Sequence, residues 1–484
     1  MRYLISFLLL IQLPLQADDE PHFNFTDHSI ECPSGPLSYT AITGTLPLFE
    51  NEEKTADIFF IGYLKEEEEN SDRPITFVFP GGPGGAGTLE SIVTFGPRRL
   101  LTATEGRSIL PPYKIIDNPE TILEFTDLVF VDPVNCGFSK SADEKNNSYF
   151  YSIEGDIQSL GQFVHTFVNT FQKWNSPKYL AGGSYGTLRC CGLASNLMQY
   201  DILVNGIIID GCAIEWATLD SERDRALPDC LLIPTFAATA WHYGRLWPEK
   251  PLEEVVDYAR RFAYDEYAPA MLQPSRLSPF EQKAFYQELA HLIGLPLETV
   301  QKYNARIDEK TFVTEFLSPE RKILGGIDTR YSGDLVAIHP YDDPQDPSYK
   351  DSKGLGCALN VYLQKELDTH LPLNTYIGFS WEAITKWDPS TYDSRGEPSF
   401  LHRMRRTLIR NPQMKVFVGS GYYDCRTPFA ATEYSFDHLD LPPSYQKNLQ
   451  FEYYLAGHGF VLDHASLQKF KKDLVRFYNT ELTH

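Results

Sequence analysis

The chain of 484 residues has few basic side chains for its size, and it lacks the patterns that mark metal sites. Its 43 Lys and Arg residues are outnumbered by 65 Asp and Glu residues, which leaves a formal net charge of −22. Nucleic-acid binding needs basic side chains that neutralise phosphates, so this charge argues against such a partner. There is no CxxC motif and no His/Cys cluster with zinc-ligand spacing, so we expect no metal and no other cofactor.

Long apolar runs are confined to the start of the chain. Arg2 precedes the almost wholly apolar stretch Ile5–Leu15, and Ala17 is followed by the acidic stretch Asp18–Glu20. This pattern predicts a secretory signal peptide over residues 1–17, and hence a secreted or periplasmic protein. An uncleaved anchor and a buried first helix are the alternatives. No later stretch approaches about 18 apolar residues, so we expect no stable membrane insertion.

Eight cysteines follow the predicted signal peptide. A secreted context permits disulfides, but the sequence leaves their pairing open. Cys190 and Cys191 are adjacent on a predicted helix and therefore point to different faces. We expect at least one pair of cysteines to be reduced and buried.

Six short runs of branched and aromatic residues, ended by Gly or Pro, are typical of buried parallel strands. They are Ile75–Phe79, Leu128–Asp132, Tyr179–Gly182, Leu203–Asp210, Met414–Gly419 and Phe451–Ala456. Helical patterns at Ile153–Thr170 and Thr187–Gln199 alternate with them. Strand and helix in alternation predict an α/β fold with a mostly parallel sheet and helices on both faces.

The pattern changes between residues 215 and 410, where helical spacing dominates. The predicted helices there are Leu231–Tyr243, Leu252–Tyr267, Pro279–Leu292 and Leu297–Ile307. We interpret the stretch as a large, mainly helical insertion that covers the carboxyl ends of the strands as a lid or pocket wall. The predicted organisation is a signal peptide (1–17), the first part of the core (18–214), the insertion (215–410) and the last part of the core (411–484).

A G-x-S-x-G motif, Gly182–Gly186, follows the third predicted strand and precedes a helix. A nucleophile elbow has this context, because its serine must project from a sharp strand-to-helix turn. Ser184 is therefore the predicted nucleophile. The alternative is a tight turn whose serine only caps the helix.

A serine nucleophile needs a base, and a histidine oriented by a carboxylate is the usual one. His458 ends a predicted strand between two glycines, and Asp424 follows another strand and a Gly-rich turn. The chain order Ser, Asp, His is that of α/β-hydrolases. Asp210 and Asp463 are rival acids: Asp210 precedes the insertion, and Asp463 follows the histidine. The predicted catalytic residues are Ser184, Asp424 and His458.

A Gly-rich loop, Phe79–Gly87, follows the first predicted strand and leaves backbone N–H groups unobstructed. We expect the N–H groups of Gly82 and Tyr185 to form the oxyanion hole. The loop lacks the Lys-Ser/Thr pair of a phosphate-binding P-loop and the spacing of a dinucleotide fingerprint.

Four segments, in their order along the chain, resemble those of the serine carboxypeptidase family, especially its secreted bacterial members. The resemblance implies the α/β-hydrolase fold. The four segments are Gly81–Gly84, Val131–Ser139, Gly182–Gly186 and the pair Asp424 and His458. Within the insertion, Leu232–Trp241 and Ile327–Asp334 also resemble the bacterial branch. The resemblance implies hydrolysis of peptide bonds through an acyl-enzyme without a cofactor.

The chain departs from the family at the residues that the resemblance links to the substrate's terminal carboxylate. Pro80 stands where the family has Asn, Gly183 where it has Glu, and Thr94 aligns approximately with a further Glu. Arg98 and Arg99 follow the oxyanion loop, and a guanidinium can bind a carboxylate with two hydrogen bonds. We therefore name both as candidate substrate-binding residues, with a surface arginine pair as the alternative.

Three functions remain open from the sequence. A carboxypeptidase is the first. A serine aminopeptidase, esterase or acyltransferase on the same fold is the second, since the motifs Gly182–Gly186 and Pro80–Gly85 also occur in prolyl and tripeptidyl aminopeptidases. A non-catalytic binding protein is the third, and the complete set of triad and oxyanion residues argues against it.

Overall fold

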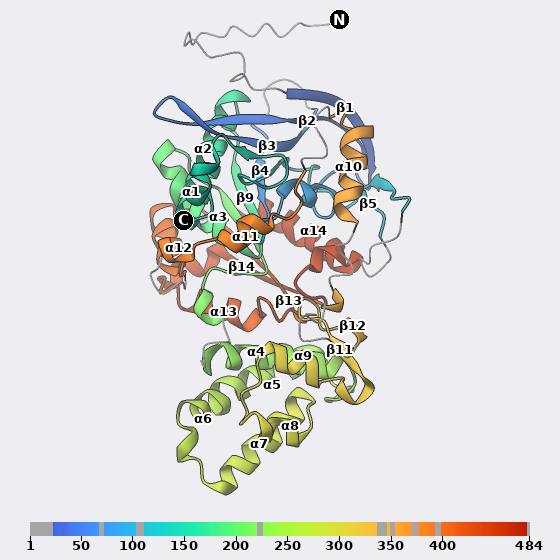
Figure 1. The fold of residues 1–484 in the computed structure, drawn as a ribbon, viewed down its shortest axis with the longest axis vertical. Coiled ribbons are helices and arrows are strands. Elements are labelled where there is room, and N and C mark those ends of the chain that lie inside the picture. The colour runs from blue at the N-terminus through green and yellow to red at the C-terminus, as the bar shows by residue number, and fades with distance from the viewer. Residues whose placement is uncertain are drawn as a thin grey trace, which may run out of the picture.

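The computed structural model describes residues 23–66, 72–102, 111–219, 226–335, 346–348, 354–369, 376–392 and 398–481. The predicted signal peptide, residues 1–17, lies outside these ranges. Figure 1 shows a sheet with helices on its two sides, and a separate group of helices packed beyond one edge of that sheet. None of the described helices is long and apolar enough to cross a bilayer.

Ten of the described strands form one sheet, in the order β1-β2-β3-β7-β4-β9-β10-β13-β14, with β8 paired to β3. Their bounds are β1 (Phe23–Cys32), β2 (Gly35–Glu50), β3 (Glu53–Lys65), β4 (Ile75–Phe79), β7 (Asp127–Val131), β8 (Lys140–Ser141), β9 (Lys178–Gly183), β10 (Gly206–Asp210), β13 (Lys415–Gly421) and β14 (Leu449–Tyr454). The strands from β7 to β14 in this order run parallel, as the sequence predicts. The long antiparallel strands β1, β2 and β3 extend the sheet beyond the predicted part.

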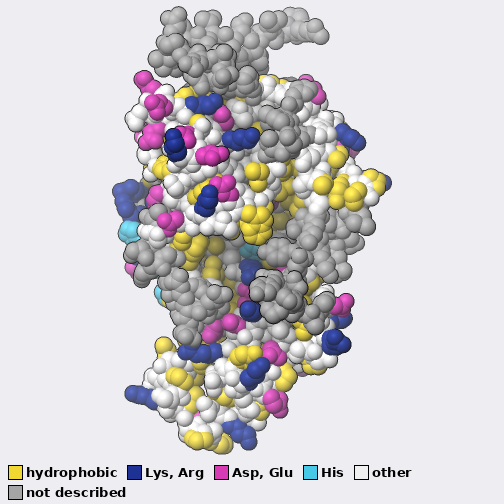
Figure 2. All heavy atoms as spheres, viewed as in Figure 1, with side chains coloured by type: hydrophobic (Ala, Val, Ile, Leu, Met, Phe, Trp, Pro, Cys, Tyr) yellow, Lys and Arg dark blue, Asp and Glu magenta, His cyan; other side chains and the backbone are white. Residues whose placement is uncertain are grey.

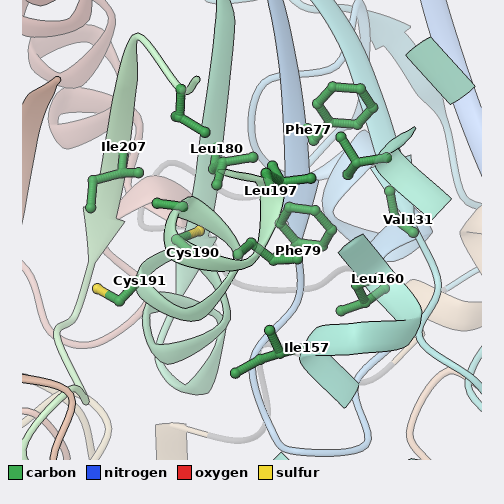
Figure 3. Packing of buried hydrophobic residues seen from close by; sticks show 14 of the residues in the cluster. Phe77, Phe79, Val131, Ile157, Leu160, Leu180, Cys190, Cys191, Leu197 and Ile207 are labelled. Atoms are coloured by element: carbon green, nitrogen blue, oxygen red, sulfur yellow. The ribbon is translucent and has the colours of Figure 1, made fainter. Parts of the chain in front are cut away.

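Apolar residues of the parallel strands face both sides of the sheet, because successive side chains of a strand point in opposite directions. Ile207 and Ile209 of β10 pack in one apolar cluster, and Ile208 packs in another. The first cluster includes side chains of α2 (Ile153–Thr170), α3 (Tyr185–Asn196) and α12 (Leu401–Arg410). The second includes side chains of α10 (Leu355–Lys365) and α14 (His464–Asn479). Figure 3 shows α2 and α3 packed on the sheet through Ile157, Leu160 and Cys190. Helices cover both faces, as predicted.

A helical part lies between β10 and β13 and has its own apolar core. Its elements are α4 (Ala226–His242), α5 (Leu252–Arg261), a π-helix (Phe262–Tyr267), α6 (Ala268–Leu272), α7 (Pro279–Ile293), α8 (Leu297–Lys302), α9 (Glu309–Glu315) and the hairpin of β11 (Lys322–Leu324) and β12 (Ser332–Asp334). From residue 354 onwards the chain returns to the sheet, where α10 and α12 pack. The predicted insertion 215–410 thus contains both a separate helical part and helices that belong to the core.

Three further helices connect these elements: α1 (Asn147–Phe150), α11 (Trp381–Lys386) and α13 (Phe429–Asp437).

All eight cysteines are free, and every one except Cys357 is buried. Cys190 and Cys191 lie in α3 against the sheet. The expectation of a reduced, buried pair is confirmed.

Candidate active site

Ser184 occupies a strained turn between β9 and α3. Its φ of 54° and ψ of −124° are rare for a residue with a side chain. The turn brings backbones so close together that only glycine fits beside it: a Cβ on Gly182 would lie 2.4 Å from the carbonyl oxygen of Gly186. A Cβ on Gly186 would lie 2.6 Å from the carbonyl oxygen of Phe79. The motif therefore has the backbone geometry of a nucleophile elbow.

Asp424 lies in the turn after β13 and is fully buried. Its Oδ1 accepts hydrogen bonds from the backbone N–H groups of Arg426 (2.7 Å) and Thr427 (3.0 Å), and its Oδ2 accepts one from the Thr427 hydroxyl (2.5 Å). Burial by itself would raise the pKa of Asp424. The charge and hydrogen bond of His458, with the hydrogen bonds from Thr427, outweigh burial and hold the pKa below its ordinary value. Asp424 is therefore a carboxylate at neutral pH.

His458 follows β14 and contacts this carboxylate directly, with 2.8 Å between its Nδ1 and Asp424 Oδ2. Burial lowers the pKa of His458, but the charge of Asp424 and the hydrogen bond to it raise the pKa by more, so it lies above the ordinary value. Because Nδ1 faces Asp424, the other ring nitrogen is left for proton transfer with a nucleophile.

The imidazole and the elbow meet at one short segment of β10 and the turn after it. The N–H of Ser184 donates to the carbonyl oxygen of Asp210 (2.8 Å). The next residue, Gly211, lies under the imidazole, because a Cβ on it would be 3.1 Å from both Cε1 and Nδ1 of His458. Ser184 and His458 are thus brought together at the carboxyl edge of the sheet from positions 274 residues apart in the chain.

The Gly-rich loop after β4 contacts the elbow. A Cβ on Gly81 would lie 3.0 Å from Cβ of Ser184, and Gly82, with φ of +116°, leaves no room for a side chain beside Gly84 and Gly85. Arg189 of α3 holds this loop, since it donates to the carbonyl oxygens of Pro80 and Gly81. Tyr185, the other predicted oxyanion residue, is the first residue of α3. Its N–H lies at a helix amino terminus, where backbone N–H groups stabilise anions.

Arg189 itself is buried and forms an ion pair with Asp156 of α2, with 2.7 Å between Nε and Oδ2. The sequence analysis missed this pair. A basic residue five positions after the nucleophile and an acid in the preceding helix were its only signals.

The candidate substrate-binding arginines lie on β5 (Arg98–Leu100), which pairs with β6 (Ile115–Asp117). Arg98 makes two hydrogen bonds to the carboxylate of Glu366 (2.9 and 3.1 Å) and an ion pair with Asp117. Arg99 contacts His464. These contacts are with α10, β6 and the start of α14, and they favour a structural role for both arginines over substrate binding.

A segment of the helical part, Gly326–Arg330, lies between the acid and base loops, and we call it the strap. Its backbone forms three hydrogen bonds with them: His458 N to Ile327 O (2.7 Å), Cys425 N to Gly326 O (3.1 Å) and Thr329 N to Tyr423 O (3.0 Å). The strap thus holds the residues beside Asp424, as well as His458 itself.

Asp328 of the strap adds a side-chain contact to the base loop. Its Oδ2 accepts the N–H of Gly457 (2.9 Å) and pairs with Arg330 (2.7 Å), which donates to the carbonyl oxygen of Leu455 (2.6 Å). A Cβ on Gly457 would lie 2.3 Å from Ile327 O, so the loop can approach the strap only with glycine there. The segment Ile327–Asp334 stood out in the sequence by resemblance, but its role is visible only in the structure.

We expect Asp328→Ala to lower kcat about 100-fold, because a base displaced by about 1 Å loses its alignment with the nucleophile. Asp328→Asn keeps an oxygen acceptor for Gly457 and should retain most of kcat. Steady-state hydrolysis of a small ester, with thermal unfolding measured in parallel, tests this. Asp334→Asn, on the exposed end of the same hairpin, is the control. A wild-type kcat in Asp328→Ala would show that the strap does not position the base.

The molecular surface is hollowed between the sheet-bearing part and the helical part. Figure 2 shows hydrophobic, acidic and basic side chains together in this hollow. Within the described ranges no group of three or more His, Cys, Asp and Glu side chains is arranged to hold a metal ion.

The strand order, the elbow and the hydrogen-bonded pair of Asp424 and His458 at the carboxyl edge are those of the α/β-hydrolase fold. Residues 34–231 match the model of the family described as serine carboxypeptidase. This match confirms the resemblance to that family, while membership of its bacterial branch stays a prediction.

Two relatives agree with this family, and one solved structure shares the fold. "Serine carboxypeptidase-like 13" of Arabidopsis thaliana is 24% identical over 198 residues, which cover 40% of this chain and 44% of the relative. "Pheromone-processing carboxypeptidase KEX1" of Cryptococcus gattii is 28% identical over 164 residues, which cover 32% of this chain and 23% of the relative. The chain spans less than half the length of these curated relatives.

The crystal structure of the prohormone-processing carboxypeptidase KEX1(Δ)p of Saccharomyces cerevisiae has a TM-score of 0.55 at 15% identity, with 91% of each chain covered. The predicted α/β-hydrolase fold is confirmed.

Proposed function

We propose that the chain is a secreted serine carboxypeptidase that acts through Ser184, His458 and Asp424. The observation that carries the proposal is the hydrogen bond of 2.8 Å between His458 and the buried Asp424, next to a strained serine elbow. Strain of this kind persists where the surrounding structure enforces it, and it clusters at active sites. Secretion rests on the signal-peptide pattern of residues 1–17.

In the proposed reaction, Ser184 Oγ attacks the peptide carbonyl carbon while His458 takes the hydroxyl proton. The N–H groups of Gly82 and Tyr185 stabilise the negative oxygen, and Asp424 stabilises the imidazolium. His458 then donates its proton to the leaving amine as the C–N bond breaks, which leaves an acyl-enzyme on Ser184. Water attacks this ester, again with His458 as base, and the peptide acid is released with Ser184 restored.

We further propose that the helical part is a wall of the substrate pocket, because its strap contacts both catalytic loops. The second candidate function is a serine aminopeptidase or esterase on the same fold. Pro80 and Gly183 favour it, since neither supplies the side chain that the family uses on a terminal carboxylate.

Peptides blocked at one end separate the two candidates. We expect the enzyme to cleave an amino-blocked dipeptide such as benzyloxycarbonyl-Phe-Leu and to refuse Phe-Leu amide with a free amino end. Chromatography measures the release of leucine from the first peptide and of leucine amide from the second. Cleavage of the second peptide alone would favour the aminopeptidase, and cleavage of neither, with a reactive Ser184, would favour an esterase.

A further inference from the structure

Two acidic side chains that the proposed mechanism does not use lie beside the catalytic residues. The first is Asp210, at the end of β10 and directly opposite Gly183 in the register of β9 and β10. A Cβ on Gly183 would lie 3.8 Å from Oδ2 of Asp210 and 4.0 Å from its Cβ. Asp210 thus places a carboxyl group beside the residue that precedes the nucleophile, where Gly183 itself has no side chain.

The second is Glu90, in the 3₁₀-helix η1 (Gly87–Ile92), which follows the oxyanion loop. Its side chain is half-buried. It interacts electrostatically with the imidazole of His458, and so does Asp210; the two acids also interact with each other. Two different elements therefore place carboxyl groups within electrostatic range of the same imidazole.

Asp210 has a polar atom without a partner. Its Oδ1 is buried, and in the part of the chain that the structure describes no group forms a hydrogen bond with it. A buried polar atom left unpaired is destabilising, because it has lost its hydrogen bonds to water without replacing them. This position calls for a ligand that forms hydrogen bonds.

Burial raises the pKa of both acids and so favours their protonated forms. Burial raises the pKa of Glu90 to about 7, although His458 acts in the opposite direction. Burial also raises the pKa of Asp210 well above its ordinary value; His458 opposes this, while Glu90 and Asp424 add to it. Tyr376 interacts electrostatically with Glu90, and Tyr454 with Asp210; burial raises the pKa of both phenols, which stay neutral. Below about pH 7 Glu90 therefore offers an O–H group rather than a charge, and the raised pKa of Asp210 favours its O–H form as well.

The position of Asp210 and Glu90 near His458 indicates which part of a bound substrate these two side chains contact. Because Nδ1 of His458 contacts Asp424, the other nitrogen of the ring must deliver the proton to the leaving amine. Groups around this imidazole therefore surround the residue that leaves. The leaving residue of a carboxypeptidase ends in a carboxylate, which accepts hydrogen bonds from protonated carboxyl groups and binds such donors strongly.

We propose that Asp210 and Glu90 together bind the terminal carboxylate of the peptide substrate, a role that rests on the proposed function and names the specificity-determining residues of its site. Arg98 and Arg99 are then not needed for this role. An ionised pair would instead attract the ammonium group of a peptide's amino end, which is the alternative that the experiment must exclude.

The test compares benzyloxycarbonyl-Phe-Leu with its carboxamide. The measured quantity is the ratio of kcat/KM for the acid to kcat/KM for the amide. Titration of His458 changes both constants equally, because both substrates need that base, and so it does not change the ratio. Carboxylate binding needs the protonated pair, so the ratio should be high below pH 7 and should fall as the pH rises through about 7. A ratio near one at every pH from 5 to 8 would overturn the proposal.

Variants assign the effect to the two residues. Asp210→Ala should lower the ratio at pH 6 about 10- to 100-fold, the usual range for a lost hydrogen bond to a charged group. Glu90→Gln keeps an N–H donor but cannot ionise, so its ratio should stay constant across pH 7. Glu144→Gln, on an exposed helix, is the matched control, and it should leave both the ratio and the hydrolysis of p-nitrophenyl acetate at wild-type values. Unchanged ratios in both variants would overturn the assignment.

Binding to the Ser184→Ala variant separates this inference from the proposed function. Calorimetry should show that this inactive protein binds benzyloxycarbonyl-Phe-Leu more tightly than the amide at pH 6, and that Asp210→Ala removes the difference. An enzyme without peptidase activity that still shows this preference would refute the proposed function and keep the carboxylate site. Tighter binding of Phe-Leu amide, lost in Asp210→Ala, would assign the pair to an ammonium group and overturn the proposal.

Discussion

Ser184→Ala is expected to abolish labelling by a fluorophosphonate and to lower kcat for benzyloxycarbonyl-Phe-Leu by about 10⁴-fold or more, because the acyl-enzyme can no longer form. The hydroxyl is the reacting group itself, and nothing else in the elbow can replace it. Labelling is read by mass spectrometry of the intact protein, and kcat by release of leucine.

The matched control is Ser195→Ala, in the same helix α3, where the hydroxyl only donates to the carbonyl oxygen of Gly192 (2.7 Å). This variant should label and turn over as the wild type does. If Ser184→Ala retains more than a tenth of the wild-type kcat, or if the label is found on another residue, Ser184 is not the nucleophile.

Asp424→Asn is expected to lower kcat by about 10⁴-fold, because an amide favours the wrong tautomer of His458 and cannot stabilise the imidazolium. The rising limb of the pH profile should also move. The carboxylate raises the pKa of His458 above 6.5, so its removal lowers that pKa and shifts the limb of the residual activity to lower pH. The profile of kcat/KM for p-nitrophenyl acetate, a substrate without a carboxylate, reports this base alone.

Asp463→Asn tests the rival acid that the sequence leaves open. Asp463 caps α14 through the N–H of Ser466 and lies 3.6 Å from Arg330. We expect a small loss of stability and a kcat close to that of the wild type. An equal loss of kcat in Asp424→Asn and Asp463→Asn would mean that Asp424 is not the orienting acid.

The parallel part of the sheet could be predicted because its signals are local. Ile75–Phe79 is a strand with the predicted bounds, and α2 covers Ile153–Thr170, also as predicted. Strands buried on both faces are continuous apolar runs, and a helix between them shows a 3.6-residue period. The antiparallel strands β1 and β2 are different: half-buried and rich in polar residues, they left no such run. The third antiparallel strand, β3, does contain a buried apolar run, Ile58–Ile61, which was not among the predicted strands.

The order of Ser184, Asp424 and His458 in the chain, with glycines beside the serine and the histidine, predicted a site that the structure brings together at one edge of the sheet. Those glycines are required by backbone contacts, as at Gly182 and Gly186. Residue type and spacing carry this information, because the chemistry of a serine nucleophile permits few alternatives.

Charged partners could not be predicted in the same way. Arg98 was a candidate for carboxylate binding from the sequence, and in the structure its guanidinium is bonded to Glu366, 268 residues away. An arginine can pair with any acid that the fold brings near, and its own neighbours in sequence do not indicate which one.

The sequence by itself determined the α/β sheet, the elbow and the identity of the three candidate catalytic residues, because each depends on local periodicity or on a short motif. Only the tertiary structure decided which acids surround the imidazole and what holds its loop. Asp210 meets Gly183 through the register of two strands, and Asp328 meets Gly457 across 129 residues of chain. Such contacts depend on how separate elements pack, and no segment of the sequence contains that information alone.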